Sequence, residues 1–186
     1  MTIPLKEGSP DVINCKIYPL THEERGLLEK FLAKELELGR IKEGPLPYTS
    51  PVYFINKKDS EEKCIIMDYH EVNKWTVRDN NPLPNIREAL ENPRNKMLFS
   101  KFDIHWRYNN IQITKGDQYK AAFKMKHGTF IPQVMYFGLK NAPPFFQRMM
   151  PRDFRELLQR YPKNLRNYMD NWWIATDNTP EGMALH

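Results

Sequence analysis

A short segment near the C-terminus, residues 166–174, constrains the fold more than any other part of this chain. It places Asp170 and Asn171, which favour turns, between strand-forming residues on both sides, and this pattern predicts a β-hairpin with Asp170 at its tip. A second carboxylate, Asp103, lies at the end of a strand-like apolar run over residues 97–104. Carboxylates on neighbouring strands commonly hold divalent metal ions for phosphoryl transfer.

The two carboxylates are 67 positions apart in the sequence, so only the fold can bring them together. A third carboxylate would strengthen a metal site at the position after Asp170, and the chain has neutral Asn171 there. The alternative is that Asp103 and Asp170 are ordinary carboxylates at the ends of strands. The histidines show no pairing of the kind that binds zinc.

Positive charge is concentrated in the middle of the chain. Residues 94–166 carry 15 Lys and Arg against 4 Asp and Glu, whereas the whole chain of 186 residues has a net charge of only +5. Such a segment suits a polyanionic partner, although a solvated basic face without a partner is the alternative. No apolar run approaches the roughly 18 residues of a membrane span. We therefore expect an intracellular protein, in the cytoplasm or the nucleus, that does not contact a membrane.

Local patterns predict a mixture of helices and strands without regular βαβ alternation, which is typical of an α+β fold. Thr21 and Glu24 form a capping box at the start of a helix that ends before Gly39. Leu27, Leu28, Phe31, Leu32 and Leu36 are the expected apolar face of that helix. Further helices are expected at residues 84–91 and 141–160, the second interrupted by Pro151, and strands at residues 51–58 and 64–69 with a turn at 59–62. The aromatic pairs Phe145-Phe146 and Trp172-Trp173 are expected in the core, with base stacking as the alternative.

Several short motifs follow one another in an order typical of one protein family. They are IYPLT (17–21), SPVYF (50–54), DY (68–69), NKWT (73–76), PLP (82–84), FSKFDI (99–104), YNNIQI (108–113), KAAFK (120–124), FGLKNAP (137–143), FQ (146–147) and YMD (168–170). From residue 6 to residue 186 the chain resembles the reverse transcriptase of gypsy-type LTR retrotransposons, of the kind abundant in fungi.

The resemblance implies a fingers-and-palm fold of the α+β class, with an antiparallel palm sheet packed on helices and an end before the thumb. Residues 1–20 would form an extended arm, and residues 21–93 a fingers-like region with an N-terminal helix. Residues 94–186 would form an incomplete palm, with a fingers segment at about 109–140 interleaved.

The implied activity is that of an RNA-directed DNA polymerase, which transfers deoxynucleotides to a primer 3′ end with two Mg²⁺ ions, or with Mn²⁺. The implied catalytic residues are Asp103, Asp170 and Asn171, of which the two aspartates would bind metal. The implied nucleotide-binding residues are Lys63, Ile104, Arg107, Tyr108, Phe137 and Gly138. The implied template- and primer-binding residues are Lys57, Lys58, Tyr168 and Met169. Partners would be an RNA or DNA template–primer, dNTP, and other polyprotein domains (thumb, RNase H, integrase) or a second copy of the chain.

The sequence departs from the family pattern at several positions. Asn171 replaces the second Asp of the Tyr-x-Asp-Asp box, Cys64 and His70 replace family arginines, and Arg107 stands where the family has a small residue. We expect Arg107 to crowd the nucleotide pocket beside Tyr108. These changes and the missing thumb predict impaired activity of this chain. The alternative function is that of a non-catalytic nucleic-acid-binding relic or repurposed fragment.

Overall fold

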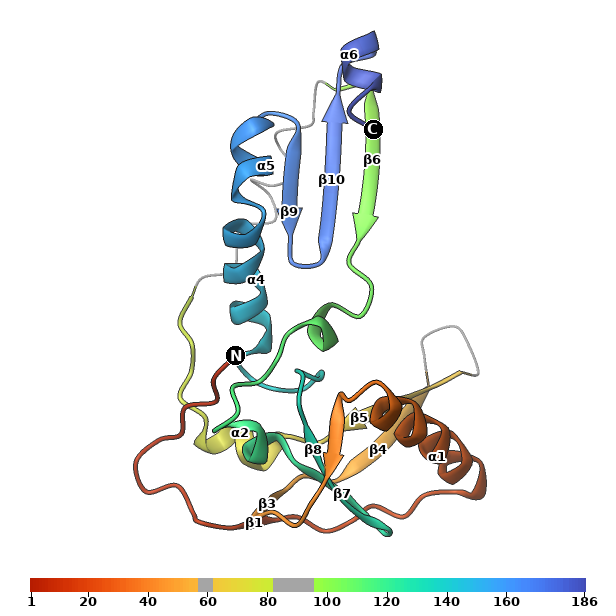
Figure 1. The fold of residues 1–186 in the computed structure, drawn as a ribbon, viewed down its shortest axis with the longest axis vertical. Coiled ribbons are helices and arrows are strands. Elements are labelled where there is room, and N and C mark those ends of the chain that lie inside the picture. The colour runs from red at the N-terminus through yellow and green to blue at the C-terminus, as the bar shows by residue number, and fades with distance from the viewer. Residues whose placement is uncertain (57–61, 82–95) are drawn as a thin grey trace. The chain divides into compact units, whose positions relative to one another are not determined.

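The computed structural model describes residues 1–56, 62–81 and 96–186 (Figure 1). The chain forms two compact units, each of which combines two separate segments. The first unit contains residues 1–78 and 108–142, and the second contains residues 79–107 and 143–186. The chain therefore leaves the first unit, enters the second, and repeats this passage once.

Helix α1 (His22–Glu37) of the first unit begins and ends where the sequence predicts. The backbone N–H of Glu24 donates to the Thr21 hydroxyl, and the backbone N–H of Thr21 donates to the Glu24 carboxylate at 2.9 Å. After the last turn, Gly39 has a φ of 65°, the left-handed conformation that ends many helices. The capping box is confirmed.

The buried face of α1 differs from the predicted one. Leu28 is buried as expected, but Leu27 and Leu36 are exposed and Glu35 is buried in their place. Glu35 accepts a hydrogen bond from the Tyr136 hydroxyl at 2.5 Å and forms an ion pair with Arg40 at 3.4 Å. Because these partners compensate the buried charge, the helix turns a face containing a carboxylate inward.

The first unit also contains three small groups of strands. An antiparallel sheet has the order β2-β8-β7, β4 pairs with β5 in an antiparallel hairpin, and β1 pairs with β3 in parallel. Their bounds are β1 Ile13–Asn14, β2 Ile41–Glu43, β3 Tyr48–Thr49, β4 Val52–Asn56, β5 Lys63–Met67, β7 Phe123–Met125 and β8 Gly128–Pro132. Helix α2 covers His70–Trp75, and short 3-10 helices cover Arg107–Asn110 and Gln118–Ala121. The two predicted strands around residues 51–69 are confirmed over the described residues. Residues 57–58 of the first predicted strand and residues 59–61 of the predicted turn lie outside the described part of the chain.

The second unit is built on one antiparallel sheet of the order β6-β10-β9, with helices beside it (Figure 1). Its strands are β6 Leu98–Asp103, β9 Leu165–Tyr168 and β10 Asn171–Thr176, and its helices are α4 Ala142–Asp153, α5 Arg155–Arg160 and α6 Pro180–Met183. Strands β9 and β10 form the hairpin predicted from residues 166–174, with Asp170 in the turn. The mixed helices and antiparallel sheets confirm the α+β class.

The helix predicted at residues 141–160, with an interruption at Pro151, is two helices in the structure. Pro151 lies inside α4 and has no N–H to donate to the carbonyl of Gln147, and the helix ends at Asp153. Phe154, between the helices, packs edge-on against Trp172, with ring centroids 4.8 Å apart. Trp172 and Phe146 are buried, as the core interpretation requires, whereas their neighbours Trp173 and Phe145 are only half-buried.

The helix expected at residues 84–91 lies outside the described residues. None of the helices in the described part of the chain is long and apolar enough to cross a membrane.

Candidate active site

Strand pairing brings the two predicted catalytic carboxylates to the same end of one sheet. In the register of β6 and β10, Asn171 lies opposite Asp103, so Asp170 immediately precedes the residue paired with Asp103. Beyond the last pair, the backbone N–H of Ile104 donates to the carbonyl of Asp170 at 3.0 Å. The expected arrangement on neighbouring strands is therefore observed, despite the long separation in sequence.

The hairpin turn is held from the side by a helix. Met169 has a φ of 56°, a positive value of the kind that two-residue hairpin loops require. Its backbone N–H donates to the side-chain oxygen of Gln147 in α4 at 2.7 Å. Because Gln147 is itself buried, this hydrogen bond fixes the backbone of the turn at Met169. Asp170 is the next residue, so its position is fixed as well.

Arg107 contacts Asp170 directly. Its Nη1 forms an ion pair with Oδ1 of Asp170, and the two side chains are 23% and 16% exposed. The amide nitrogen of Asn171 approaches the same Oδ1 at 3.4 Å. That Arg107 crowds a nucleotide pocket beside Tyr108 stays a prediction; in the structure its guanidinium contacts the carboxylate that is predicted to bind metal.

The donor set in this arrangement does not fit two metal ions. Asp103 is exposed and Asp170 is occupied by a guanidinium, and Asn171 contributes no charge. In residues 1–56, 62–81 and 96–186, no three His, Cys, Asp or Glu side chains gather closely enough to hold a metal ion. Divalent ions bound for phosphoryl transfer normally rely on carboxylates that are free to coordinate them.

Three of the predicted nucleotide-binding residues come together in the first unit. Tyr108 is buried, and its ring meets that of Phe137 edge-on with centroids 4.8 Å apart. Gly138 follows with a φ of 101°, and its carbonyl accepts a hydrogen bond from the Asn73 amide at 2.7 Å. The Asn73 side-chain oxygen accepts from the backbone N–H of Lys140 at 2.8 Å, so Asn73 bridges this loop.

Lys63, also predicted to bind nucleotide, is engaged elsewhere in the first unit. Its ammonium forms ion pairs with Glu23 and Glu24 of α1, each at 3.2 Å. The hydrogen bond to Glu23, followed in magnitude by the hydrogen bond to Glu24, raises the pKa of Lys63. Lys57 and Lys58, predicted near the template, lie outside the described residues.

The predicted site residues thus fall into two groups, one in each unit. Ile104, Arg107, Tyr168 and the catalytic set belong to the second unit, and Tyr108, Phe137, Gly138 and Lys63 belong to the first. No site role is predicted from the sequence for Gln147, which holds the Asp170 turn, or for Asn73, which holds the Gly138 loop. Their presence in the FQ and NKWT motifs was the available signal.

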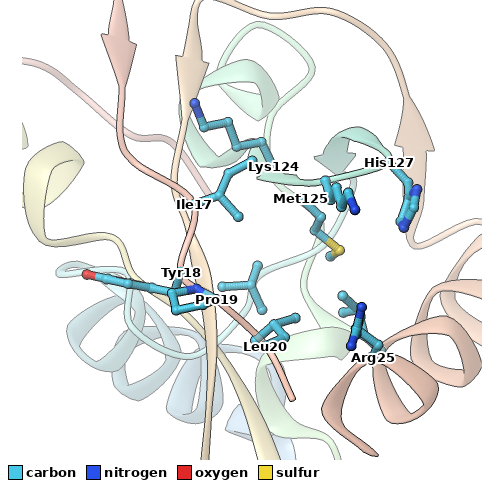
Figure 2. A pocket seen from close by; sticks show the side chains of 11 residues that line it. Ile17, Tyr18, Pro19, Leu20, Arg25, Lys124, Met125 and His127 are labelled. Atoms are coloured by element: carbon cyan, nitrogen blue, oxygen red, sulfur yellow. The ribbon is translucent and has the colours of Figure 1, made fainter. Parts of the chain in front are cut away.

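An apolar cavity of about 370 Å³ lies in the first unit (Figure 2). It lies among Ile17, Leu20 and Met125, with Arg25 and His127 also on its wall. None of the predicted site residues lines it. This cavity therefore does not mark the proposed site of chemistry.

Comparisons with known proteins identify the family. The profile described as "Reverse transcriptase (RNA-dependent DNA polymerase)" matches residues 55–186. The chain is 31% identical over 153 residues to the "Retrovirus-related Pol polyprotein from transposon 297" of Drosophila melanogaster, covering 80% of this chain and 14% of that protein. It is 32% identical over 130 residues to the "Transposon Tf2-3 polyprotein" of Schizosaccharomyces pombe, covering 70% of this chain and 10% of the other.

The fold also matches that of a solved relative. The foamy viral protease-reverse transcriptase in complex with RNA/DNA hybrid superposes with a TM-score of 0.80 at 19% identity, over 97% of this chain and 24% of that one. The fold is therefore the fingers-and-palm fold of reverse transcriptases. The chain spans only 12% to 16% of the length of polyprotein relatives such as those from transposons opus, 297 and Tf2-7. The family match covers more than half of this chain, and the chain belongs to the reverse transcriptase (RNA-dependent DNA polymerase) family.

Proposed function

We propose that this chain is the RNA-directed DNA polymerase domain of an LTR-retrotransposon Pol polyprotein, which adds deoxynucleotides to a primer 3′ end. The observation that carries the proposal is the β6–β10 pairing, which brings Asp103 and Asp170 to one end of a sheet in a member of the reverse transcriptase family. The Pol polyproteins that match this chain support the retrotransposon context.

In this proposal, Asp103 and Asp170 are the carboxylates that hold Mg²⁺ or Mn²⁺, and Asn171 offers an uncharged oxygen beside them. Reverse transcriptases are generally dependent on divalent metal ions. Two ions are the finer expectation, and they require Asp170 to be freed from Arg107, because a carboxylate oxygen that accepts from a guanidinium is a poor ligand for a second cation.

Nucleotide recognition falls to the residues around Tyr108. The ring of Tyr108 is buried and packs against Phe137, and Gly138 follows in the chain. The sugar of a dNTP would pack against the surface that these residues form. Ile104 would contribute its backbone next to Asp170, and Lys63 would need to leave Glu23 and Glu24 to reach a phosphate.

The proposed partner is an RNA or DNA template–primer. The excess of Lys and Arg in residues 94–166 supports binding to its phosphates, and a foamy viral relative was solved with an RNA/DNA hybrid. Tyr168, Met169, Lys57 and Lys58 are the proposed contacts. Other polyprotein domains or a second copy of this chain would complete the assembly inside the cell.

Extension of a DNA primer on an RNA template tests the proposal, at a Mg²⁺ concentration high enough to compete with an ion pair. The parent should extend weakly and Asn171→Asp more strongly, because a third carboxylate restores negative charge around the metal. Adding Asp103→Asn to the Asn171→Asp chain should abolish extension.

Asp177→Asn is the matched control, since Asp177 is an exposed carboxylate of the same unit that pairs with Lys96 at 2.8 Å. In the Asn171→Asp background it should leave extension unchanged. Extension that survives Asp103→Asn, or no extension by any variant, would refute the proposal.

A further inference from the structure

Arg107 stands in a position where its charge acts on the proposed metal site, and this inference rests on the role proposed above for Asp170. Its guanidinium and the Asp170 carboxylate form an ion pair in which both side chains are largely shielded from water. Asp170 is thereby neutralised within the protein itself.

The backbone conformation before Arg107 indicates that its side chain is held in place next to Asp170, unlike a mobile ion pair on the surface. The hydrogen bond from the Ile104 N–H to the Asp170 carbonyl, at 3.0 Å, ties the end of β6 to the hairpin turn. Two residues later, Trp106 adopts a φ of 56°, a left-handed conformation that is uncommon for a bulky residue. This reversal leads directly into Arg107, whose side chain meets the Asp170 carboxylate.

The same oxygen of Asp170 is also approached by the neighbouring side chain of Asn171. Asn171 directs its amide nitrogen to Oδ1 of Asp170 at 3.4 Å, while Nη1 of Arg107 binds that atom. A divalent cation at this carboxylate would have to displace the guanidinium or remain close to a positive charge. Either requirement weakens metal binding, because like charges in a partly buried site repel more strongly than in water.

We infer that Arg107 is an internal counter-ion of Asp170, which competes with divalent metal and holds the chain in a state of low metal affinity. The site then contains two carboxylates and one guanidinium, and its net charge is −1. Neutralising Arg107 should raise affinity for a divalent cation by roughly tenfold, the scale expected for one partly screened charge at close range.

Mn²⁺ binding to the full chain, followed by electron paramagnetic resonance without nucleic acid, tests this inference. Arg107→Met removes the charge and keeps much of the side-chain volume, and its Kd for Mn²⁺ should be about tenfold lower than that of the parent. Arg107→Lys keeps the charge and should bind Mn²⁺ much as the parent does. Adding Asp170→Asn to Arg107→Met should cancel the gain.

Arg148→Met is the matched control, because Arg148 pairs with Asp79 at 2.8 Å in the same unit without contacting Asp170. Its Mn²⁺ affinity should equal that of the parent. If circular dichroism shows that Arg107→Met is unfolded, Arg107→Gln replaces it with the same expectation. Equal Mn²⁺ affinities in the parent and a folded neutral variant, or a gain that survives Asp170→Asn, would overturn the inference.

Metal binding and primer extension separate this inference from the proposed function. Tighter Mn²⁺ binding by Arg107→Met, with no extension by any variant, supports the counter-ion and refutes the polymerase. Extension that depends on Asp103, with equal Mn²⁺ affinity in the parent and Arg107→Met, supports the polymerase and refutes the counter-ion.

Discussion

Substitution of Gly138 tests how tightly the loop next to Phe137, which we propose to contact the nucleotide, is packed. Its φ is 101°, and a Cβ built there would lie 3.0 Å from the Met67 carbonyl oxygen and 3.3 Å from Cδ2 of Tyr69. The Gly138 carbonyl is held by Asn73, and Tyr69 is buried with its hydroxyl bonded to the Ala121 carbonyl at 2.9 Å. Neither the glycine nor its neighbours can therefore shift at little cost.

Gly138→Ala should destabilise the protein through two separate effects. Forcing an L-residue into this backbone region costs about 1–3 kcal/mol, and the contact with a backbone oxygen adds about 1–3 kcal/mol of overpacking. The reduced entropy of the unfolded chain offsets about 0.4–1 kcal/mol of this. The net loss should be about 1–5.5 kcal/mol, which lowers the Tm of a chain of this size by at least about 2 °C.

Urea unfolding and thermal melting of the parent and two variants provide the assay. Gly116→Ala is the matched control, because a Cβ at Gly116 meets nothing within 4 Å and its φ is not positive. It should be neutral or slightly stabilising. If Gly138→Ala were as stable as Gly116→Ala, the argument from the positive φ and the close approach to Met67 would be refuted.

Two further predictions concern α1. Gly26→Ala should stabilise the chain by about 0.5–1 kcal/mol in urea unfolding, because a Cβ there meets nothing within 4 Å and alanine favours the helix; a loss of stability would contradict this. The hydrogen bond from the Thr21 backbone N–H, with lesser help from Lys63, holds the pKa of Glu24 below its usual value. Its stabilising effect is therefore present above the unfolded-state pKa and lost as the pH falls through the lowered folded-state pKa. Glu24→Gln should be less stable than the parent at neutral pH and equal to it in acid, and a difference that does not change with pH would count against this.

Features encoded by neighbouring residues were predictable from the sequence. The capping box of Thr21 and Glu24 and the turn at Asp170 depend on interactions across a few positions, and both appear where expected. An interruption of the helix near Pro151 was predictable because that residue has no N–H to donate. The interruption itself lies at Phe154, whose ring packs against Trp172, and that contact was not predictable from neighbouring residues.

Features that depend on distant partners were not predictable in the same way. The buried face of α1 includes Glu35 because Tyr136, 101 positions away, donates a hydrogen bond to it. The contact of Arg107 with Asp170 spans 63 positions and follows a left-handed residue at Trp106 that no local pattern indicates. The resemblance to the family implied the catalytic role of Asp103 and Asp170. The guanidinium of Arg107 beside Asp170 became visible only in the structure.

We propose that Asp103 and Asp170 form the polymerase site and that Arg107 and Asn171 weaken it. The most direct measurement is the Mg²⁺ dependence of RNA-templated primer extension by the Arg107→Met/Asn171→Asp chain, by Asn171→Asp alone, and by the double variant carrying Asp103→Asn. The Arg107→Met/Asn171→Asp chain should extend the primer at a lower Mg²⁺ concentration than Asn171→Asp, and adding Asp103→Asn should abolish extension. Extension that is indifferent to Asp103, or an unchanged Mg²⁺ requirement after removal of the Arg107 charge, would contradict it.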